Sequence, residues 1–255
     1  VEAGVRSGDL QAPFPEEANR RLVSVLSLFH FAPSETARQA LLVEGVPDGS
    51  LHVVGNSGID ALMNTSRRTD LPWPSDLPPV PDGHRMVLVT LHRRENFGDP
   101  LQRILLSLRD FANLHPGTHL VYPVHPNPNV LAPAKACLAG LPNVHLLQPV
   151  EYPVLVRLLK ESFAVFTDSG GLQEEGPALG KPVLVFRDVT ERPEAVAAGG
   201  AMLVGSDPDA FRQVALPLGE NPDHYAKVAV PRFPYGRGDA SERITSVLKS
   251  FFGLP

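Results

Sequence analysis

Residues 86–91 of the chain read MVLVTL, an apolar run that is followed directly by the polar sequence HRREN of residues 92–96. Further apolar runs rich in Val, Leu and Phe follow at 119–124, 144–147, 163–167, 182–186 and 201–204. Runs of this length without polar alternation are typical of strands that are buried on both faces of a parallel sheet. Segments of helix length separate them, over residues 100–114, 129–139, 152–162, 171–179, 192–198 and 207–218. This alternation predicts a doubly wound α/β domain.

The part of the chain ahead of residue 83 follows a shorter pattern. It predicts helices over 15–31 and 34–44, a strand over 51–54 and a helix that begins at 59; a terminal helix is expected over 241–252. Five prolines within residues 71–82 predict a stiff linker. The piece before this linker is too short for a complete sheet domain, and the chain opens on Val-Glu-Ala-Gly rather than on Met. We therefore expect a fragment or a processed product.

Composition excludes several classes of protein. The 255 residues include 23 Lys and Arg against 28 Asp and Glu, a net charge of −5, which argues against nucleic-acid binding through a general basic field. One cysteine, Cys137, excludes an internal disulfide framework and a four-cysteine zinc site. No signal peptide or membrane span is predicted, and no histidine pair has the spacing and carboxylate company of a metal site.

Polar residues follow the predicted strands, and in an open parallel sheet the strand ends form the ligand-binding edge. Residues 167–171 read TDSGG and lead into a predicted helix. Ser169, Gly170 and Gly171 suit a phosphate, because the glycines permit a close backbone approach and the helix N-terminus favours an anion. The alternative is a simple turn in which Ser169 caps the helix. Arg187 and Arg192, after the next strand, are candidates to complete an anion clamp.

Carboxylates and histidines accompany this turn. Glu174 and Glu175 lie in the first helical turn, where the dipole favours acids, but one of them is expected to face the site, where ribose is the natural partner. His92 ends an apolar strand and is a candidate acid, base or phosphate donor; the alternative is a plain strand-end histidine. His125 follows the second strand in the same way. The pattern indicates a nucleotide with a pyrophosphate.

Four blocks of sequence together resemble the non-hydrolysing UDP-N-acetylglucosamine 2-epimerases. They are residues 1–9 (VEAGVRSGD), 15–20 (PEEANR), 90–98 (TLHRRENFG) and 167–175 (TDSGGLQEE), with support from 122–128 (YPVHPNP) and 190–195 (TERPEA). The resemblance implies two Rossmann-like domains of the glycosyltransferase-B type, the N-terminal one only partly present. The implied domains are the later part of the N-terminal domain (1–70), a Pro-rich linker (71–82), a UDP-binding domain (83–238) and a terminal helix that crosses back (239–255).

The resemblance also implies an activity and a set of site residues. The activity is reversible C2 epimerisation of UDP-N-acetylglucosamine to UDP-N-acetylmannosamine, by elimination and re-addition of UDP through a 2-acetamidoglucal. The implied catalytic residues are Glu2, Glu16 and His92, although acids at a helix start are more often simple caps. The implied UDP-binding residues are Ser169, Gly170, Gly171, Glu175 and Arg192. Arg93 and His125 match positions near a regulatory UDP-sugar site of some bacterial members.

The family implies no cofactor and no metal, a homodimer and a cytoplasmic location, with UDP-N-acetylglucosamine or UDP as partner and neither nucleic acid nor membrane. Two alternatives stay open from the sequence. One is a UDP-sugar glycosyltransferase of the same fold, and the other is a nucleotide-sugar-binding fragment without activity.

Overall fold

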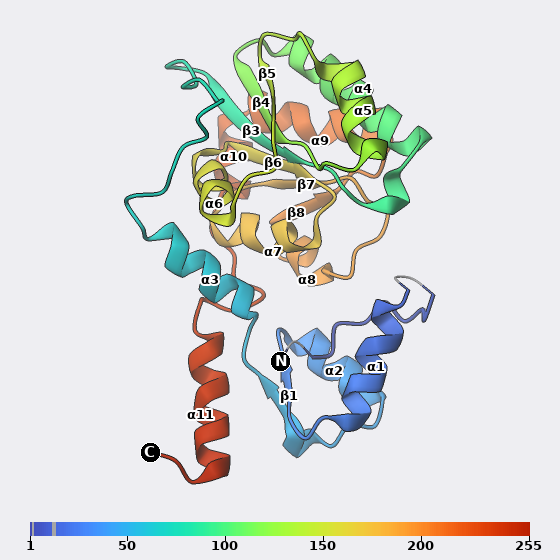
Figure 1. Ribbon diagram of the computed structural model, residues 1–255, viewed down its shortest axis with the longest axis vertical. Helices are drawn as coiled ribbons and strands as arrows, with labels where there is room; N and C mark the ends of the chain where they lie inside the picture. The colour runs from blue at the N-terminus through green and yellow to red at the C-terminus, as the bar shows by residue number, and fades with distance from the viewer. Residues whose placement is uncertain (2, 12–13) are drawn as a thin grey trace. The chain divides into compact units, whose positions relative to one another are not determined.

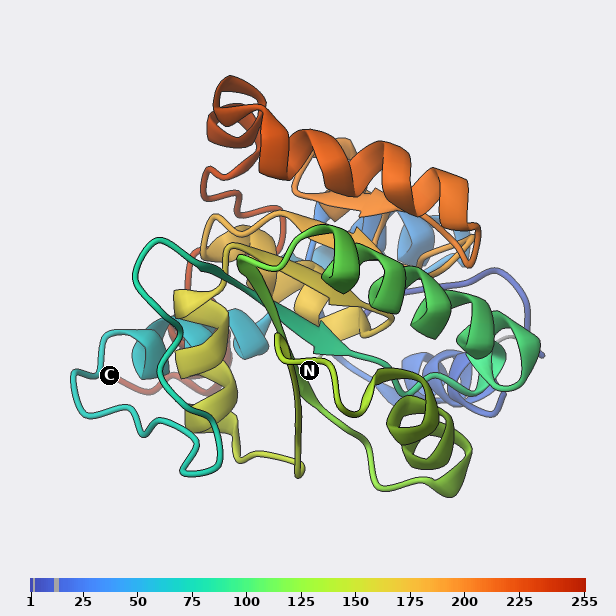
Figure 2. The same cartoon turned by 90° about the horizontal axis from the view of Figure 1, so that it is seen from above.

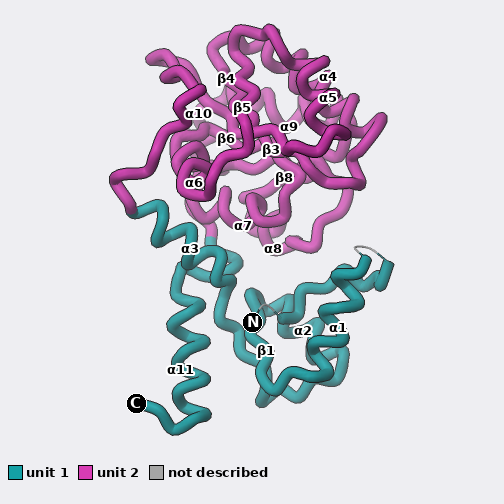
Figure 3. Tube along the Cα trace, in the orientation of Figure 1, with its two compact units in different colours: residues 1–67, 233–255 teal, residues 68–232 magenta. Residues whose placement is uncertain are grey.

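The computed structural model describes residues 1, 3–11 and 14–255, and these divide into two compact units (Figure 3). Unit 1 comprises Val1–Arg67 and Phe233–Pro255, and unit 2 comprises Arg68–Arg232. Among the described residues, none of the helices combines the length and the apolar character needed to cross a membrane.

Unit 2 is built on one parallel sheet whose strands carry the apolar runs. Its elements are β3 (Arg85–Thr90), the short helix η2 (Arg94–Asn96), α4 (Asp99–Leu114), β4 (Thr118–Pro123), α5 (Pro128–Leu138), β5 (Val144–Leu147), α6 (Tyr152–Glu161), β6 (Ala164–Thr167), α7 (Gly170–Ala178), β7 (Val183–Val185), α8 (Pro193–Ala197), β8 (Ala201–Leu203), α9 (Pro208–Glu220) and α10 (Pro222–Val228). All six predicted strands are confirmed. Helix α10 was not predicted, although Asn221, whose side chain accepts from the His224 N–H, and Pro222 at the first helical position are a start signal.

The six strands lie in the order β5-β4-β3-β6-β7-β8, and each pairs in parallel with its neighbours. This is the doubly wound order, in which the chain winds outward from the middle in both directions. Helices cover both faces of the sheet (Figures 1 and 2). The core includes fully buried side chains from β3, β6 and β7 and from α4, such as Val87, Phe166, Leu184 and Leu105. Burial on both faces explains why these strands read as continuous apolar runs.

Three histidines lie side by side at the N-terminal ends of the strands β3, β4 and β5. His84 precedes β3, and His119 and His145 are the second residues of β4 and β5. His84 Nδ1 lies 2.9 Å from His119 Nε2, and His119 Nδ1 lies 2.9 Å from His145 Nε2. We call this set the histidine row.

Unit 1 is smaller and holds a two-stranded parallel sheet. Its elements are α1 (Glu16–Leu26), β1 (His30–Ala32), α2 (Glu35–Val43), the short helix η1 (Asp48–Ser50), β2 (Leu51–Val53), α3 (Ser57–Ser66) and α11 (Ala240–Phe252). The helix predicted over 15–31 was wrong in its last part, because residues 30–32 pair with β2 instead. The apolar pattern of this segment fits either state, and the tertiary pairing decides between them.

The end of the chain is attached to unit 1 through α3. The Asn56 N–H donates to the Tyr235 carbonyl oxygen at 2.7 Å, and a Cβ on Gly55 would lie 3.0 Å from Gly236 Cα. The buried carboxylate of Asp60 accepts the N–H groups of Ala240 and Ser241 at 3.0 and 2.6 Å. These contacts begin ahead of α11, and unit 1 includes the chain from Phe233 onward.

Candidate active site

The strand order of unit 2 reverses between β3 and β6, which makes this pair the switch point of the sheet. Thr90 and Thr167, the last residues of the two strands, are register partners, and their hydroxyl oxygens lie 2.6 Å apart. Ligands of doubly wound sheets bind beyond such strand ends. The segments that follow the two strands, 91–96 and 168–171, contain His92 and the Ser169 turn, which the sequence singled out.

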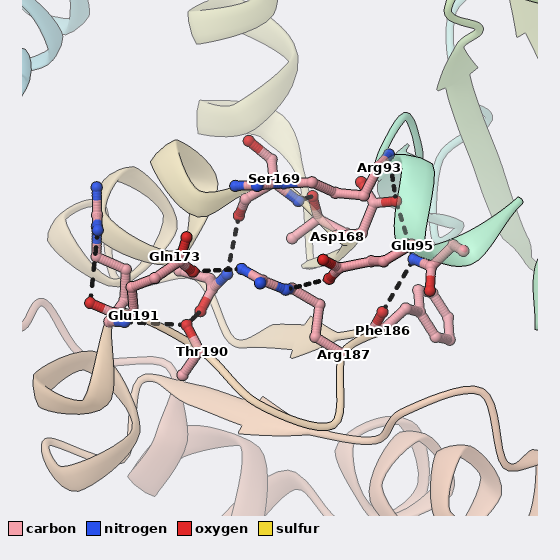
Figure 4. A network of polar contacts seen from close by, with 12 residues as sticks. Arg93, Glu95, Asp168, Ser169, Gln173, Phe186, Arg187, Thr190 and Glu191 are labelled. Carbon is pink, nitrogen blue, oxygen red and sulfur yellow. Dashed lines mark hydrogen bonds and ion pairs between the residues drawn. The ribbon is translucent and has the colours of Figure 1, made fainter. Parts of the chain in front are cut away.

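Asp168 joins these two segments (Figure 4). Its side chain is fully buried and accepts the backbone N–H of His92 at 3.0 Å and that of Arg93 at 2.9 Å. Asn96 donates its side-chain N–H to the same carboxylate at 3.0 Å and to the Phe186 carbonyl oxygen at 3.1 Å. The ends of β3, β6 and β7 are thereby held together by charge-assisted and amide hydrogen bonds.

His92 lies beside this carboxylate. Its Nδ1 is 3.3 Å from Asp168 Oδ1, and its ring stacks on that of His125 with centroids 6.1 Å apart. Burial lowers the pKa of His92, the charge of Asp168 acts in the opposite direction, and the positive charges of Arg93 and His125 lower the pKa further. His92 therefore favours the neutral form near pH 7 until an anion binds.

The turn at Ser169 precedes α7 without a side-chain cap, so its polar groups are available to a ligand. Ser169 occupies the N-cap position of α7, yet its side chain makes no capping hydrogen bond. Gly171 is exposed, while a Cβ on Gly170 would lie 3.1 Å from Nη2 of Arg93. Neither glycine has positive φ, so at Gly170 small size rather than backbone conformation accounts for glycine. The turn leaves the first amides of α7 and a serine hydroxyl available to an anion, with the Arg93 guanidinium alongside.

A buried amide links this turn to the loop that follows β7 (Figure 4). Gln173 donates to the Ser169 carbonyl oxygen at 3.1 Å and accepts from the Thr190 hydroxyl at 2.6 Å. The backbone N–H of Arg192 donates to the same hydroxyl oxygen at 3.0 Å. The relay from Ser169 through Gln173 and Thr190 to Arg192 fixes the spacing of the two loops.

The two arginines proposed as an anion clamp carry ion pairs of their own. Arg187 contacts Glu95 and Glu191, each at 2.6 Å. Arg192 pairs through Nε with Glu174. The prediction of a clamp did not foresee these partners, which orient the guanidinium groups and reduce their net positive charge.

Glu174 and Glu175 are the fifth and sixth residues of α7, so the prediction that they lie in its first turn was wrong. The two neighbours have different surroundings. Glu174 is buried against Arg192, whereas Glu175 accepts the Tyr152 hydroxyl at 2.9 Å. Burial raises the pKa of Glu175 to about 7, the Tyr152 hydrogen bond opposes this, and the Glu174 charge adds to it. Glu175 therefore titrates near neutral pH.

The two predicted catalytic acids belong to the N-terminal part of the chain. Glu2 lies outside the described residues. Glu16 is the first residue of α1 and is exposed, with Pro15 before it at the N-cap position. Arg93 and His125, the predicted regulatory residues, lie next to other predicted site residues. A Cβ on Gly170 would lie 3.1 Å from Nη2 of Arg93, and His125 stacks on His92.

Asp168, Asn96, Gln173 and Tyr152 were not predicted to have a role in the site. The sequence did contain a signal for Asp168, because a carboxylate that directly follows a buried strand lies at the ligand-binding end of the sheet. Within the described part of the chain, no group of three or more His, Cys, Asp or Glu side chains is arranged to hold a metal ion.

The doubly wound sheet, with a histidine and a glycine turn at its switch point, is the arrangement of Rossmann-type α/β proteins that bind nucleotides. Residues 1–249 match the family model described as UDP-N-acetylglucosamine 2-epimerase. The chain therefore belongs to the UDP-N-acetylglucosamine 2-epimerase family, a family of isomerases.

Individual relatives agree with this assignment. The chain is 47% identical over 258 residues to a probable UDP-N-acetylglucosamine 2-epimerase of Ralstonia nicotianae, covering 99% of the chain and 69% of the relative. It is 44% identical to the UDP-N-acetylglucosamine 2-epimerase of Escherichia coli K12, covering 98% and 68%. The crystal structure of the Neisseria meningitidis UDP-GlcNAc 2-epimerase bound to UDP-GlcNAc is similar, with a TM-score of 0.93, 45% identity and coverage of 98% and 69%. These matches also confirm the predicted glycosyltransferase-B-like fold class.

Proposed function

We propose that this protein interconverts UDP-N-acetylglucosamine and UDP-N-acetylmannosamine. The observation that carries the proposal is that Asp168 ties the His92 segment to the Ser169 segment at the switch point of a sheet from this family. The similar Neisseria meningitidis epimerase binds UDP-GlcNAc in its crystal structure, which supports the same sugar nucleotide as substrate here.

The chemistry requires cleavage of two bonds. The C2–H bond breaks as a carboxylate takes the proton, the C1–O bond breaks with its electron pair leaving on UDP, and a C1=C2 double bond forms. Re-addition of UDP, with a proton delivered to the other face of C2, gives the epimer. Two acids suit the proton transfers, and we assign them to Glu2 and Glu16.

The departing diphosphate needs stabilisation as negative charge builds on it. We assign this to the Ser169–Gly170–Gly171 turn with the α7 amides, to Arg192, and to the protonated form of His92. The diphosphate itself raises the pKa of His92, because an adjacent anion favours the imidazolium. Glu175, which accepts a hydrogen bond from the Tyr152 hydroxyl, is assigned to the ribose. Its carboxylate is suited to accept hydrogen bonds from the ribose hydroxyls.

Three further features belong to the proposal. They are binding of UDP-GlcNAc at a regulatory site that includes Arg93 and His125, a homodimer, and a cytoplasmic location. Light scattering of the purified protein tests the dimer, and a sigmoidal dependence of rate on UDP-GlcNAc that R93A abolishes tests the regulatory site.

Incubation of the protein with UDP-GlcNAc alone, in D₂O, tests the activity. We expect UDP-N-acetylmannosamine that carries deuterium at C2, measured by proton NMR. A glycosyltransferase would form no manno isomer and would need an acceptor sugar to transfer the sugar. Binding of UDP with no turnover would instead indicate a nucleotide-sugar-binding protein.

A further inference from the structure

The carboxylate of Asp168 accepts N–H groups from His92, Arg93 and Asn96. The backbone N–H of His92 lies within 3.0 and 3.1 Å of its two oxygens, and the N–H of Arg93 and the Asn96 amide reach one of them at 2.9 and 3.0 Å. Its side chain has 0% exposure. An ionised carboxylate accepts hydrogen bonds but donates none, and in each of these contacts the Asp168 carboxylate is the acceptor.

This anion determines which nitrogen of His92 carries the proton. Nδ1 of His92 lies 3.3 Å from Asp168 Oδ1, so a proton on Nδ1 is attracted to the carboxylate and a lone pair there is repelled. A neutral imidazole has one N–H, and a hydrogen-bond or charge partner at one nitrogen selects the tautomer. With Nδ1 turned to Asp168, Nε2 is the nitrogen available to a ligand, and the side chain is 38% exposed.

The other charged groups around His92 act against its protonation. Arg93 belongs to the same loop and His125 follows β4, and both disfavour the imidazolium, as does burial. Asp168, from the end of β6, favours it. Asn96 holds the carboxylate in place from η2 and is itself anchored on the Phe186 carbonyl oxygen.

We infer that Asp168 is the positioning residue of His92, which holds the imidazole in the Nδ1–H form and directs Nε2 to the departing diphosphate. The identity of the group that Nε2 meets rests on the proposed function. The tautomer does not, because it follows from contacts within unit 2.

Nitrogen NMR of the ¹⁵N-histidine-labelled protein tests the tautomer without any turnover. The His92 signals are assigned by their loss in H92N. Above the pKa of His92, long-range ¹H–¹⁵N correlations should show the proton on Nδ1. A proton on Nε2 in the unmodified protein would overturn the inference, whatever the behaviour of any variant.

Asp168→Asn tests the role of the carboxylate charge. The amide keeps the size of the side chain but removes the negative charge and places an N–H₂ group among the N–H donors that Asp168 accepts. We expect the measured pKa of His92 to fall by about one unit in D168N, the size of an ordinary carboxylate–histidine interaction. Asp60→Asn is the matched control, because Asp60 is also a buried carboxylate that accepts two backbone N–H groups, but in unit 1. D60N should lose stability and leave the His92 titration unchanged.

Kinetics supply the second measurement. D168N should lower kcat by about 10- to 100-fold, as expected for an impaired acid–base group, with KM changed less than threefold and the His92-dependent limb of the pH profile moved to lower pH. A folded D168N protein with an unchanged His92 pKa and tautomer would refute the inference. Absence of epimerisation in the unmodified protein would refute the proposed function alone, since the NMR result stands by itself. If D168N does not fold, the tautomer of His92 in the unmodified protein alone tests the inference.

Discussion

Glu16 and Glu17 are neighbours at the start of α1, yet one is exposed and the other is completely buried. Glu17 accepts the backbone N–H of Ser7 at 3.1 Å and pairs with Arg21 at 3.4 Å. Successive residues of a helix point about 100° apart, so one of the two acids can serve the structure while the other serves a ligand. Glu17 thus fixes the segment around Ser7 against α1, and Glu16 stays exposed, as its proposed role in proton transfer requires.

Exchange of each acid for its amide separates the two roles. E16Q should lower turnover by at least about 100-fold, because a proton-transfer group is lost, while affinity for UDP and the unfolding midpoint stay unchanged. E17Q should lower the free energy of unfolding by about 1–3 kcal/mol, the cost of impairing a buried charged hydrogen bond. Steady-state kinetics, calorimetric UDP titration and urea unfolding measure these effects. Near-normal turnover in E16Q would contradict the assignment.

Replacement of His92 by Asn should abolish most turnover and preserve UDP binding. The loss follows because the uncharged amide cannot supply a proton or a positive charge to the diphosphate. Calorimetric titration with UDP and the epimerisation assay measure the two properties. His224→Asn on α10 is the control and should behave as the unmodified protein. An H92N variant that keeps a normal rate would show that the imidazole has no part in the reaction.

Removal of the Tyr152 hydroxyl should change the pH dependence of UDP binding. That hydroxyl lowers the pKa of Glu175, which burial has raised to about 7. Since ribose hydroxyls donate to the ionised carboxylate, UDP affinity should rise with pH through about 7. In Y152F the pKa of Glu175 rises further, so the increase in affinity moves to higher pH and binding at pH 7 weakens.

Tyr225→Phe is the matched control for Y152F, because its hydroxyl donates to the Phe163 carbonyl oxygen instead. Calorimetry between pH 6 and 8.5 should give the same curve for Y225F and the unmodified protein. E175Q should remove the Glu175-linked part of the pH dependence and leave the part due to ionisation of the phosphate. The assignment of Glu175 to ribose is wrong if E175Q and the unmodified protein have the same pH dependence.

The histidine row should make the protein less stable in mild acid. Burial lowers the pKa of His119, and the neighbouring His145 and His84 lower it further; burial also lowers that of His145. The unfolded chain then binds more protons than the folded one below the ordinary histidine pKa of about 6.5, so stability falls as pH drops through that value. Urea unfolding at pH 7.5 and 5.5 measures the loss. The fall in the free energy of unfolding between these two pH values should be smaller in H119N. If it is equally large in H119N, the histidine row is not the cause of the acid sensitivity.

Much of the fold could be predicted because each strand of unit 2 is buried on both faces, and its sequence shows this without reference to distant residues. Strand β1 lacked such a signal, since three residues that pair with β2 look like the end of the preceding helix. The long-range pairing that determines this segment is not visible in the local pattern.

The candidate site was predictable to the extent that topology gathers strand ends at one edge. His92 and Ser169 follow strands that turn out to be adjacent, so their proximity follows from strand order. The partners of these residues were not predictable. The pairing of Arg192 with Glu174 and the position of Asp168 beneath His92 depend on side-chain directions that emerge from packing.

The buried amide of Gln173 holds two loops of the proposed UDP site at a fixed separation. Because it connects Ser169 to the Thr190 loop, the separation between these two loops is determined during folding and not by whatever molecule arrives. These hydrogen bonds resist movement of the two loops relative to each other, so we expect a ligand with a longer or shorter bridge than a pyrophosphate to bind more weakly. Inhibitors aimed at this protein should therefore keep the length of the bridge between nucleoside and sugar and vary its charge.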